Sequence, residues 1–315
     1  MEFVKGFKWK YGITVKELVE QLSAVGFQAI HAYRAGEIIL KMKREKAKII
    51  LAFTSNLGGT SGLRDFIAQL VKLGVPDILV TTAGSIEEDI MKAMGEKFLI
   101  TKFTADDVEL HEKGINRIGN LAITNDSYVR FEGFITRILK EIYKQHKKLT
   151  VSELLHEIGK RLNDENSFLY QAAKRNVPIY CPAITDGAIG FHLFMAQEYY
   201  PEFVLDVVND FKDMVLRLSP DERKGVIVLG GGVSKHFALL STMLSGGADY
   251  AVYITTSREI SGSLSGAQTR EAKSWGKVKD DSDAVTVHGD ATILFPLIMS
   301  YALDKMKEEG LIKDE

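Results

Sequence analysis

Residues 271–277 place a lysine, a tryptophan and a glutamate close enough in sequence to act together on an amine. Lys277 could form a Schiff base if its surroundings are partly dry, because such surroundings favour the neutral amine. The face of Trp275 can attract a cation, and Glu271 offers a carboxylate to an ammonium group. Most lysines are solvated surface residues. The segment alone is therefore compatible with amine chemistry or with an ordinary exposed surface segment.

Four loops of small residues follow apolar runs and precede expected helices. In an open parallel sheet, ligands bind beyond the carboxyl ends of the strands. Small residues there let the backbone approach a pyrophosphate, and helix N-termini attract its negative charge. Asp290 could accept hydrogen bonds from a ribose. This pattern suggests a dinucleotide site, but no G-x-G-x-x-G follows the first strand, so plain turns remain an equal alternative. The loops are residues 55–59, 82–84, 230–232 and 289–291.

Further polar side chains stand near these loops. The acids Glu87, Glu88 and Asp89 are expected in the first turn of a helix, where the helix dipole favours them. Alternatively, one of the three binds an ammonium group. Lys235 and His236 follow the triple glycine at a helix start, where a histidine with a lowered pKa would suit a general base. The other six histidines form no metal-ligand pattern, so we expect no metal.

The composition is that of a soluble globular protein, with 315 residues, 45% hydrophobic and 26% charged. A net charge of -2 argues against nucleic acid and acidic membranes as partners. Cys181 is the single cysteine, which excludes an intrachain disulfide and a cysteine-cluster zinc site. The sequence shows no secretion signal and no membrane-spanning apolar run, so we expect a cytoplasmic protein.

Apolar runs alternate with helical patterns along the chain. This order predicts an α/β fold with a doubly wound, mostly parallel, Rossmann-like sheet covered on both faces. We expect one domain over residues 1–315, with a helical N-terminal part (1–46) and a helical insertion (about 104–175). The second helix of the N-terminal part is expected from about Ala32 to Lys46. Capping boxes at Thr14 and Thr150 should open two of the helices. The expected strands include residues 49–53, 77–81, 226–229, 250–254 and 285–287, and a short strand precedes the turn at Asp186.

Many ordered segments resemble the deoxyhypusine synthase family, from near the N-terminus to about residue 300. The most distinctive are the run Gly-Ile-Asn-Arg-Ile-Gly-Asn and the lysine segment described first. The matching segments are residues 26–29, 54–57, 79–84, 87–89, 114–120, 182–187, 229–233 with 235–236, 248–254, 271–277 and 295–297.

The resemblance implies NAD-dependent transfer of an aminobutyl group from spermidine to a lysine of the hypusine-carrying translation factor, through an enzyme-lysine imine. Lys277 would be the nucleophile, His236 a proton-handling or amine-contacting residue, and Glu88, Glu271 and Trp275 the amine pocket. A homotetramer is also implied. The positions that match NAD contacts are Ser55, Asn56, Thr82, Ala83, Gly84, Asp186, Gly231, Thr256, Ser257, Asp290 and Ala291.

The sequence lacks several acidic residues of the family pattern. Phe191 and Leu264 stand where the family places spermidine-binding carboxylates, and Ser261 replaces a further acid. The loop at residues 58–59 is one residue longer. An ammonium buried without a partner costs several kcal/mol, so we expect poor use of spermidine.

Three functions therefore stay open. The first is a deoxyhypusine synthase with a rearranged pocket. The second is a related aminoalkyl transferase with another amine donor or a small acceptor, as in homospermidine synthesis. The third is an NAD-binding paralogue that assembles with a catalytic chain, and the presence of Lys277 and His236 argues against it.

Overall fold

The computed structural model describes residues 3–312, which form two compact units built from interleaved segments. The first unit contains the described residues up to Thr54, then Leu70–Val80, and those from Phe211 onward. The second contains Ser55–Gln69 and Thr81–Asp210. Because the chain crosses repeatedly between the units, the division does not decide between one domain and two, and the single-domain expectation stays a prediction.

The first unit is built on a parallel sheet with strand order β11-β10-β9-β1-β2. Leu51 of β1 pairs with Ile227 of β9, which pairs in turn with Val252 of β10. The central strands are buried on both faces because almost every residue in them is apolar. The predicted α/β fold with a mostly parallel sheet is confirmed. The strands are β1 (Lys48–Phe53), β2 (Ile78–Val80), β9 (Lys224–Leu229), β10 (Ala248–Thr255) and β11 (Val278–His288).

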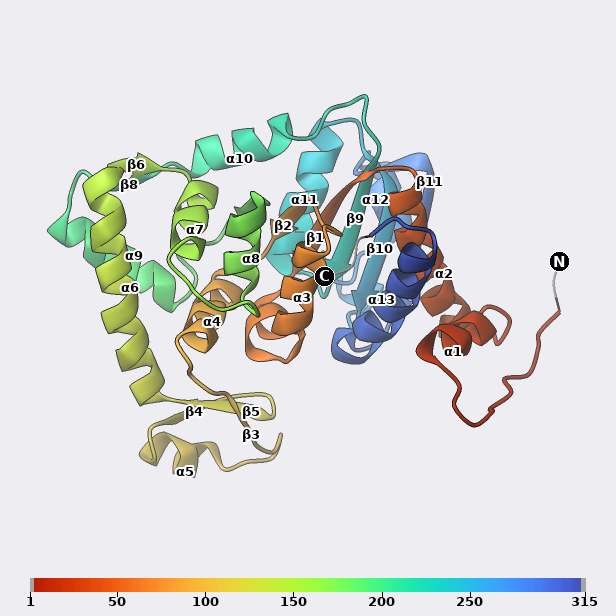
Figure 1. Cartoon of the computed structure of the whole chain (residues 1–315), viewed down its shortest axis with the longest axis horizontal. Coiled ribbons are helices and arrows are strands. Elements are labelled where there is room, and N and C mark those ends of the chain that lie inside the picture. Colours follow the sequence, from red (N-terminus) through yellow and green to blue (C-terminus); the bar gives the residue numbers. More distant parts are fainter. Residues whose placement is uncertain (1–2, 313–315) are drawn as a thin grey trace. The chain divides into compact units, whose positions relative to one another are not determined.

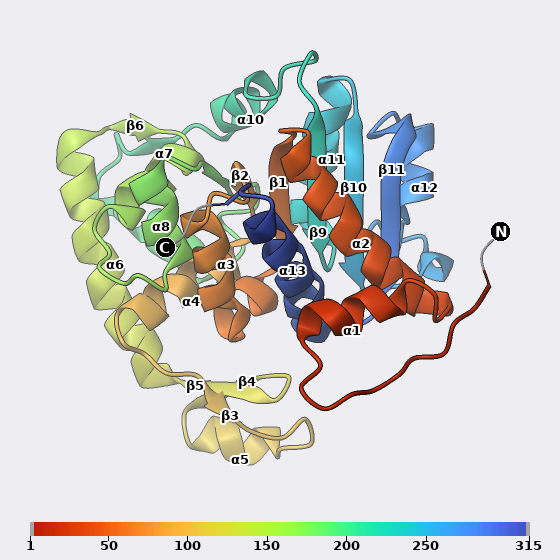
Figure 2. The same cartoon turned by 45° about the vertical axis from the view of Figure 1, so that its right-hand side comes forward.

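Helices cover both faces of this sheet. Figure 2 shows α2 and α13 on one face, while α11 and α12 lie on the other. Thr14 opens α1 with the predicted capping box, its hydroxyl and the Glu17 carboxylate each accepting from the other's backbone N–H. The helices are α1 (Val15–Leu22), α2 (Phe27–Arg44), α11 (Gly232–Leu244), α12 (Thr269–Ser274) and α13 (Ala291–Glu308), with a short 3₁₀ turn η2 (Glu259–Ser261).

Helix α2 begins five residues before the predicted start at Ala32. Its N-cap is Gly26, at φ 108°, and no side chain caps it. Phe27 follows with φ 47°, a conformation that few residues with a Cβ adopt. The start therefore lacks the usual capping signal in the sequence, and the packing of the helix onto the sheet determines it.

The second unit is mainly helical. A second capping box, at Thr150 and Glu153, opens α7 as predicted. The helices are α4 (Ala83–Ala93), α5 (Asp107–Glu112), α6 (Asn125–Gln145), α7 (Val151–Gly159), α8 (Phe168–Arg175) and α9 (Ala188–Tyr199), with a π-helical turn η1 (Asn56–Thr60). Two further helices, α3 (Leu63–Lys72) and α10 (Val207–Leu216), contribute residues to both units.

The stretch predicted as a helical insertion also contains a β-hairpin. The distinctive run at residues 114–120 forms β4 and its turn, and β4 pairs antiparallel with β5. Gly114 (φ 65°) and Gly119 (φ 60°) make the bends on either side of β4. Figure 1 shows the hairpin and α5 beside one end of α6. The short strands are β3 (Leu99–Ile100), β4 (Ile115–Ile118), β5 (Leu121–Thr124), β6 (Lys148–Leu149), β7 (Ile179–Tyr180) and β8 (Val204–Leu205).

A buried charge network joins the helices of the second unit. The Asp89 carboxylate is fully buried and accepts hydrogen bonds from Arg64 Nε at 2.6 Å and from the Ser167 hydroxyl at 2.6 Å. It also accepts from the N–H of Leu169 in the first turn of α8. Arg64 reaches the Asp164 carboxylate at 2.6 Å as well. Both charges are satisfied, so removing one partner leaves the other unpaired away from water.

We predict that Arg64→Met lowers the free energy of unfolding by about 3–5 kcal/mol, because Asp89 then stays buried without its cation. Urea unfolding at neutral pH measures the change. Arg117→Met is the control, since Arg117 pairs with a mostly exposed Asp107, and its loss should be much smaller. Equal losses in the two variants would contradict the assignment of Arg64 as a structural cation.

Candidate functional site

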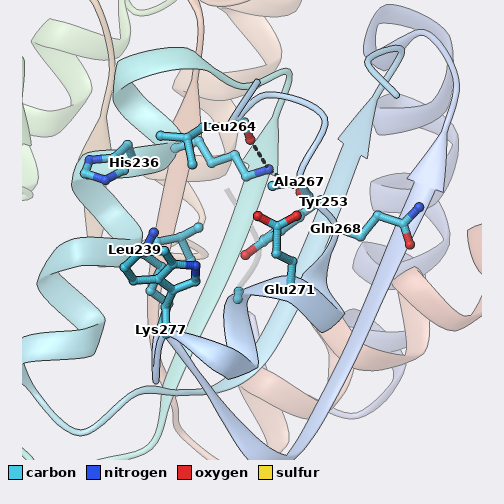
Figure 3. A pocket seen from close by; sticks show the side chains of 11 residues that line it. His236, Leu239, Tyr253, Leu264, Ala267, Gln268, Glu271 and Lys277 are labelled. Atoms are coloured by element: carbon cyan, nitrogen blue, oxygen red, sulfur yellow. Dashed lines mark hydrogen bonds between the residues drawn. The ribbon is translucent and has the colours of Figure 1, made fainter. Parts of the chain in front are cut away.

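A small cavity in the first unit collects most of the residues expected to handle an amine. It lies against β10, between α11 and the segment that runs from η2 through α12 (Figure 3). Its volume is about 20 Å³, room for roughly one water molecule. A longer ligand must therefore extend out past the exposed side chains of Leu264 and Trp275. The lining residues are Lys235, His236, Leu239, Tyr253, Leu264, Ala267, Gln268, Glu271, Ala272, Trp275 and Lys277.

Lys277 lies at the junction of α12 and β11 and is only 7% exposed. Its N–H donates to the Ala272 carbonyl at 3.0 Å, and its own carbonyl accepts from the Thr242 hydroxyl at 2.9 Å. Gly276, at φ 65°, makes the bend that brings the chain from α12 into the strand. The side-chain nitrogen lies 5.2 Å from the centre of the Trp275 ring, within reach of a cation–π interaction. The Lys277 side chain is thus buried, and hydrogen bonds on both sides of its backbone fix its position.

Lys235 is a second buried lysine in the same cavity. It is 3% exposed and donates to the carbonyls of Leu264 at 2.8 Å and Ala267 at 2.6 Å. Its nitrogen also lies 4.5 Å from the centre of the Tyr253 ring. Burial lowers the pKa of Lys235 to about 8, with Glu271 opposing this shift and Lys277 adding to it. The sequence pointed to Lys235 only as a neighbour of His236, because its carbonyl partners come from a loop about 30 residues away.

His236 is half-buried and lines the same cavity from the first turns of α11. Its pKa is lowered, as the sequence predicted, but the reason is burial followed by repulsion from Lys277. A neutral imidazole beside a lysine can accept a proton, so the geometry allows the role of a base.

Glu271 is the one carboxylate that lines the cavity among the residues that the structure describes. Figure 3 shows its carboxylate pointing toward the segment of Leu264 and Ala267. The Tyr253 hydroxyl is buried and has no hydrogen-bond partner within residues 3–312. Nothing in the sequence singled out this tyrosine, because it occupies an ordinary inward position of a buried strand.

The remaining expected dinucleotide contacts of the first unit lie at strand ends. Gly231 packs so closely on the next loop that a Cβ there would lie 2.6 Å from Ser265 Cβ. Thr256 and Ser257 follow β10, and Ala291 begins α13. Asp290 caps α13 by accepting from the Thr292 N–H at 2.7 Å, so its side chain already has a local structural partner.

The second unit holds the other expected dinucleotide contacts. Ser55 and Asn56 lie at η1, and Thr82, Ala83 and Gly84 lie at the start of α4. The Thr82 hydroxyl is buried without a partner in the described chain. A Cβ on Gly84 would lie 2.6 Å from Ser55 Cβ, so this close approach requires glycine. Asp186 is exposed, next to the start of α9.

The three consecutive acids of α4 lie in its second turn, not its first as the sequence predicted, and all three are buried. The Glu87 carboxylate accepts from the N–H of Ile189 at 2.9 Å and so caps α9. Glu88 accepts from the Thr60 hydroxyl at 2.6 Å, and burial raises its pKa to about 7. Because α4 begins at Ala83 and not at Glu87, the three acids lie inside the helix and face the protein interior.

Phe191 lies on α9 of the second unit and is 56% exposed. Its ring meets His192 edge-on at 5.4 Å and lies 6.2 Å from the ring of Phe194. The expected amine-site residues therefore divide between the units. Lys277, His236, Glu271, Trp275 and Leu264 share one cavity, while Glu88 and Phe191 belong to the second unit.

Comparisons with known proteins agree with the sequence pattern. The model of the deoxyhypusine synthase family matches residues 17–302. A "probable deoxyhypusine synthase" of Schizosaccharomyces pombe is 41% identical over 313 residues, covering 93% of this chain and 88% of its own. The deoxyhypusine synthase of Senecio vernalis is 37% identical over 338 residues, covering 98% of this chain and 90% of its own. A crystal structure of an Entamoeba histolytica protein described as a deoxyhypusine synthase superposes with a TM-score of 0.67 at 29% identity, covering 96% of this chain and 97% of its own.

The fold is of the α/β class, and the relatives named deoxyhypusine synthase show that the chain is a transferase. The chain belongs to the deoxyhypusine synthase family. Within residues 3–312, no helix is long and apolar enough to cross a membrane, and no cluster of three metal-ligating side chains occurs.

We predict that Glu88→Gln makes folding stability less dependent on pH. The pKa of Glu88 is raised from 4.5 to about 7 in the folded protein. The folded state therefore holds a proton that the unfolded state has lost, so stability falls as pH rises from about 4.5 to 7. Glutamine keeps an acceptor for Thr60 and removes this loss, which amounts to about 3 kcal/mol.

Urea unfolding of both proteins at pH 5 and pH 8 measures the difference, since contributions common to both cancel. Identical changes between the two pH values would show that Glu88 titrates near its ordinary pKa.

Proposed function

We propose that this enzyme transfers an aminoalkyl group through an imine on Lys277, with NAD as its cofactor. The observation that carries the proposal is the burial of Lys277 in a cavity that also holds Trp275, Glu271 and His236. A carboxylate and an aromatic face bind an ammonium, and a buried amine beside them can form a Schiff base.

Lys277 and His236 would carry out different parts of this reaction. Bound NAD would supply the hydride acceptor for oxidation of the carbon next to the donor's nitrogen, and its reduced form would supply the hydride for reduction of the final imine on the acceptor. The neutral amine of Lys277 attacks the resulting carbon–nitrogen double bond, and the departing amine leaves as the Lys277 imine forms. His236 takes the proton that Lys277 gives up and supplies it to the departing amine. The acceptor amine then attacks the Lys277 imine, and Lys277 departs as the carbon–nitrogen double bond moves to the acceptor, where hydride reduction completes the aminoalkyl group.

The residues present fit a dinucleotide. The Thr82 hydroxyl at the start of α4, which has no partner within residues 3–312, can bond to a ribose or phosphate oxygen. Gly231 and Gly84 stand where the backbone approaches its neighbours too closely for a side chain, next to helix N-termini. The positions that would hold the cofactor are Ser55, Asn56, Thr82, Ala83, Gly84, Asp186, Gly231, Thr256, Ser257, Asp290 and Ala291.

In the family's form of this reaction, spermidine donates the aminobutyl group and a lysine of the hypusine-carrying translation factor accepts it. The second candidate is a related transferase that uses another amine donor or a small amine acceptor. Leu264 in the cavity wall and Phe191 on α9 favour it, because neither side chain offers a charge to a polyamine. For either reaction we infer a cytoplasmic homotetramer, by the resemblance to the family.

We predict that Lys277→Arg abolishes transfer and leaves NAD binding intact, because guanidinium keeps the charge but cannot form the imine. The protein is incubated with NAD and single amines, reduced with borohydride, and its adduct located by peptide mass. Lys277→Met gives a second variant in case arginine does not fit, and calorimetry with NAD is the control. An adduct at another lysine, or turnover by both variants, would remove Lys277 from the mechanism.

We also predict that the wild-type protein uses spermidine poorly and that Phe191→Asp with Leu264→Asp improves its use. Each restored charged hydrogen bond contributes about 1.5–3 kcal/mol, so together they should raise spermidine binding roughly a hundredfold or more. Spermidine-dependent reduction of NAD and release of diaminopropane are measured in both proteins. Robust turnover by the wild type would favour the family's own reaction over the second candidate.

A further inference from the structure

The turn η1 in the second unit has an uncommon backbone. A π-helical turn closes a hydrogen bond between residues i and i+5, and such turns are found mostly at functional sites. Here the Ser61 N–H donates to the Asn56 carbonyl at 3.0 Å. The extra residue of the loop at 58–59 agrees with this wider turn. Residues 57–60 are buried, so the turn is part of the interior of its unit.

Two contacts press this turn onto the Glu88 carboxylate. A Cβ on Gly59 would lie 2.5 Å from Glu88 Oε2 and 2.7 Å from Glu88 Cβ, so glycine is needed for the backbone to approach this closely. The Thr60 hydroxyl donates to the same Oε2 at 2.6 Å. Glu88 is 4% exposed as a result, and displacement of η1 would open its carboxylate to water.

Lys92 fastens the far end of the turn. It lies one helical turn after Glu88 on α4. Its ammonium donates to the carbonyls of Thr60 at 2.9 Å and Ser61 at 3.0 Å. Both fastening points of η1, at Glu88 and at Lys92, therefore belong to the same helix.

The closed turn favours a protonated Glu88. Its pKa is about 7; burial is the main cause of this rise, Glu87 adds to it, and Thr60 and Lys92 oppose it. Glu88 also acts on Tyr128 of α6, whose pKa is raised to about 12, so the tyrosine stays neutral near neutral pH. An opened turn would return Glu88 to water and to its ordinary pKa of 4.5. Since the open form binds the proton less tightly, opening becomes more frequent as pH rises from about 4.5 to 7.

We propose that η1 is a proton-linked gate, closed over a protonated Glu88 and opened more often once that carboxyl group has ionised. The proposal rests on the proposed function, because Ser55 and Asn56 at the start of the gate are among the positions proposed to hold NAD, and it concerns the regulation of that site. The closed turn holds Asn56 in one place, so bound NAD and the Glu88 proton favour the same state.

Hydrogen–deuterium exchange of the peptide over residues 55–62, read by mass spectrometry, measures the opening. Each rate is divided by that of an unstructured peptide at the same pH. In the wild-type protein we expect protection of this peptide to fall about twentyfold between pH 5.5 and pH 7.5. Glu88→Gln keeps an acceptor for Thr60 and cannot ionise, so its protection should change less than about twofold.

The matched control is Glu96→Gln. Glu96 also accepts from a hydroxyl, that of Ser127 at 2.6 Å, but its hydrogen bond from Arg130 lowers its pKa. It therefore stays ionised over this pH range, and the control should show the wild-type fall. Saturating NAD at pH 7.5 should raise the protection of η1 in the wild-type protein at least about fivefold.

Four results would overturn the proposal. They are a wild-type change below about threefold, an equal fall in Glu88→Gln, an equal fall in the peptide of β1, which would indicate unfolding of the whole protein, and NAD that binds by calorimetry without protecting η1. If Glu88→Gln does not fold, as judged by circular dichroism, Thr60→Val decides. Without the hydroxyl the pKa of Glu88 rises further, so the fall should exceed that of the wild type.

Failure of the proposed function would look different. NAD would then not bind, while the pH-linked exchange of η1 and its loss in Glu88→Gln would persist. The two ideas can therefore be separated in one set of samples.

Discussion

Two hydrogen bonds from the buried side chain of Lys235 shape the cavity of the first unit. Lys235 donates to the carbonyls of Leu264 and Ala267, and these bonds hold the loop before α12 against α11. The loop in turn carries the apolar wall of the cavity, and α12 carries Glu271 and leads into Lys277. Loss of Lys235 would therefore free the loop that carries this wall from α11.

The second unit shows how one short sequence can serve three purposes. Glu87 caps α9, Glu88 bonds to the Thr60 hydroxyl with a raised pKa, and Asp89 forms the buried ion pair with Arg64. Consecutive helix residues point about 100° apart, so each acid meets a different neighbour. A substitution in this row would therefore affect helix capping, proton binding or stability, depending on which acid is changed.

Local rules predicted much of the fold. Continuous apolar runs predicted the strands of the parallel sheet, and the capping boxes at Thr14 and Thr150 predicted the starts of α1 and α7. The β-hairpin at β4 and β5 was missed because four-residue strands are too short for their period to stand out from helix. The start of α2 was missed because Gly26 and Phe27 provide no side-chain cap.

The sequence by itself determined the strand and loop pattern, the placement of Glu271, Trp275 and Lys277 close together in the chain, and the absence of carboxylates at Phe191 and Leu264. Those features depend on residue type and near neighbours, which the sequence shows directly. Only the tertiary structure decided that Lys235 and Tyr253 share the cavity, that the Tyr253 hydroxyl is buried with no partner within residues 3–312, and that the α4 acids are buried. Burial and pKa shifts arise from groups far apart in the chain, and folding alone brings those groups within reach of one another.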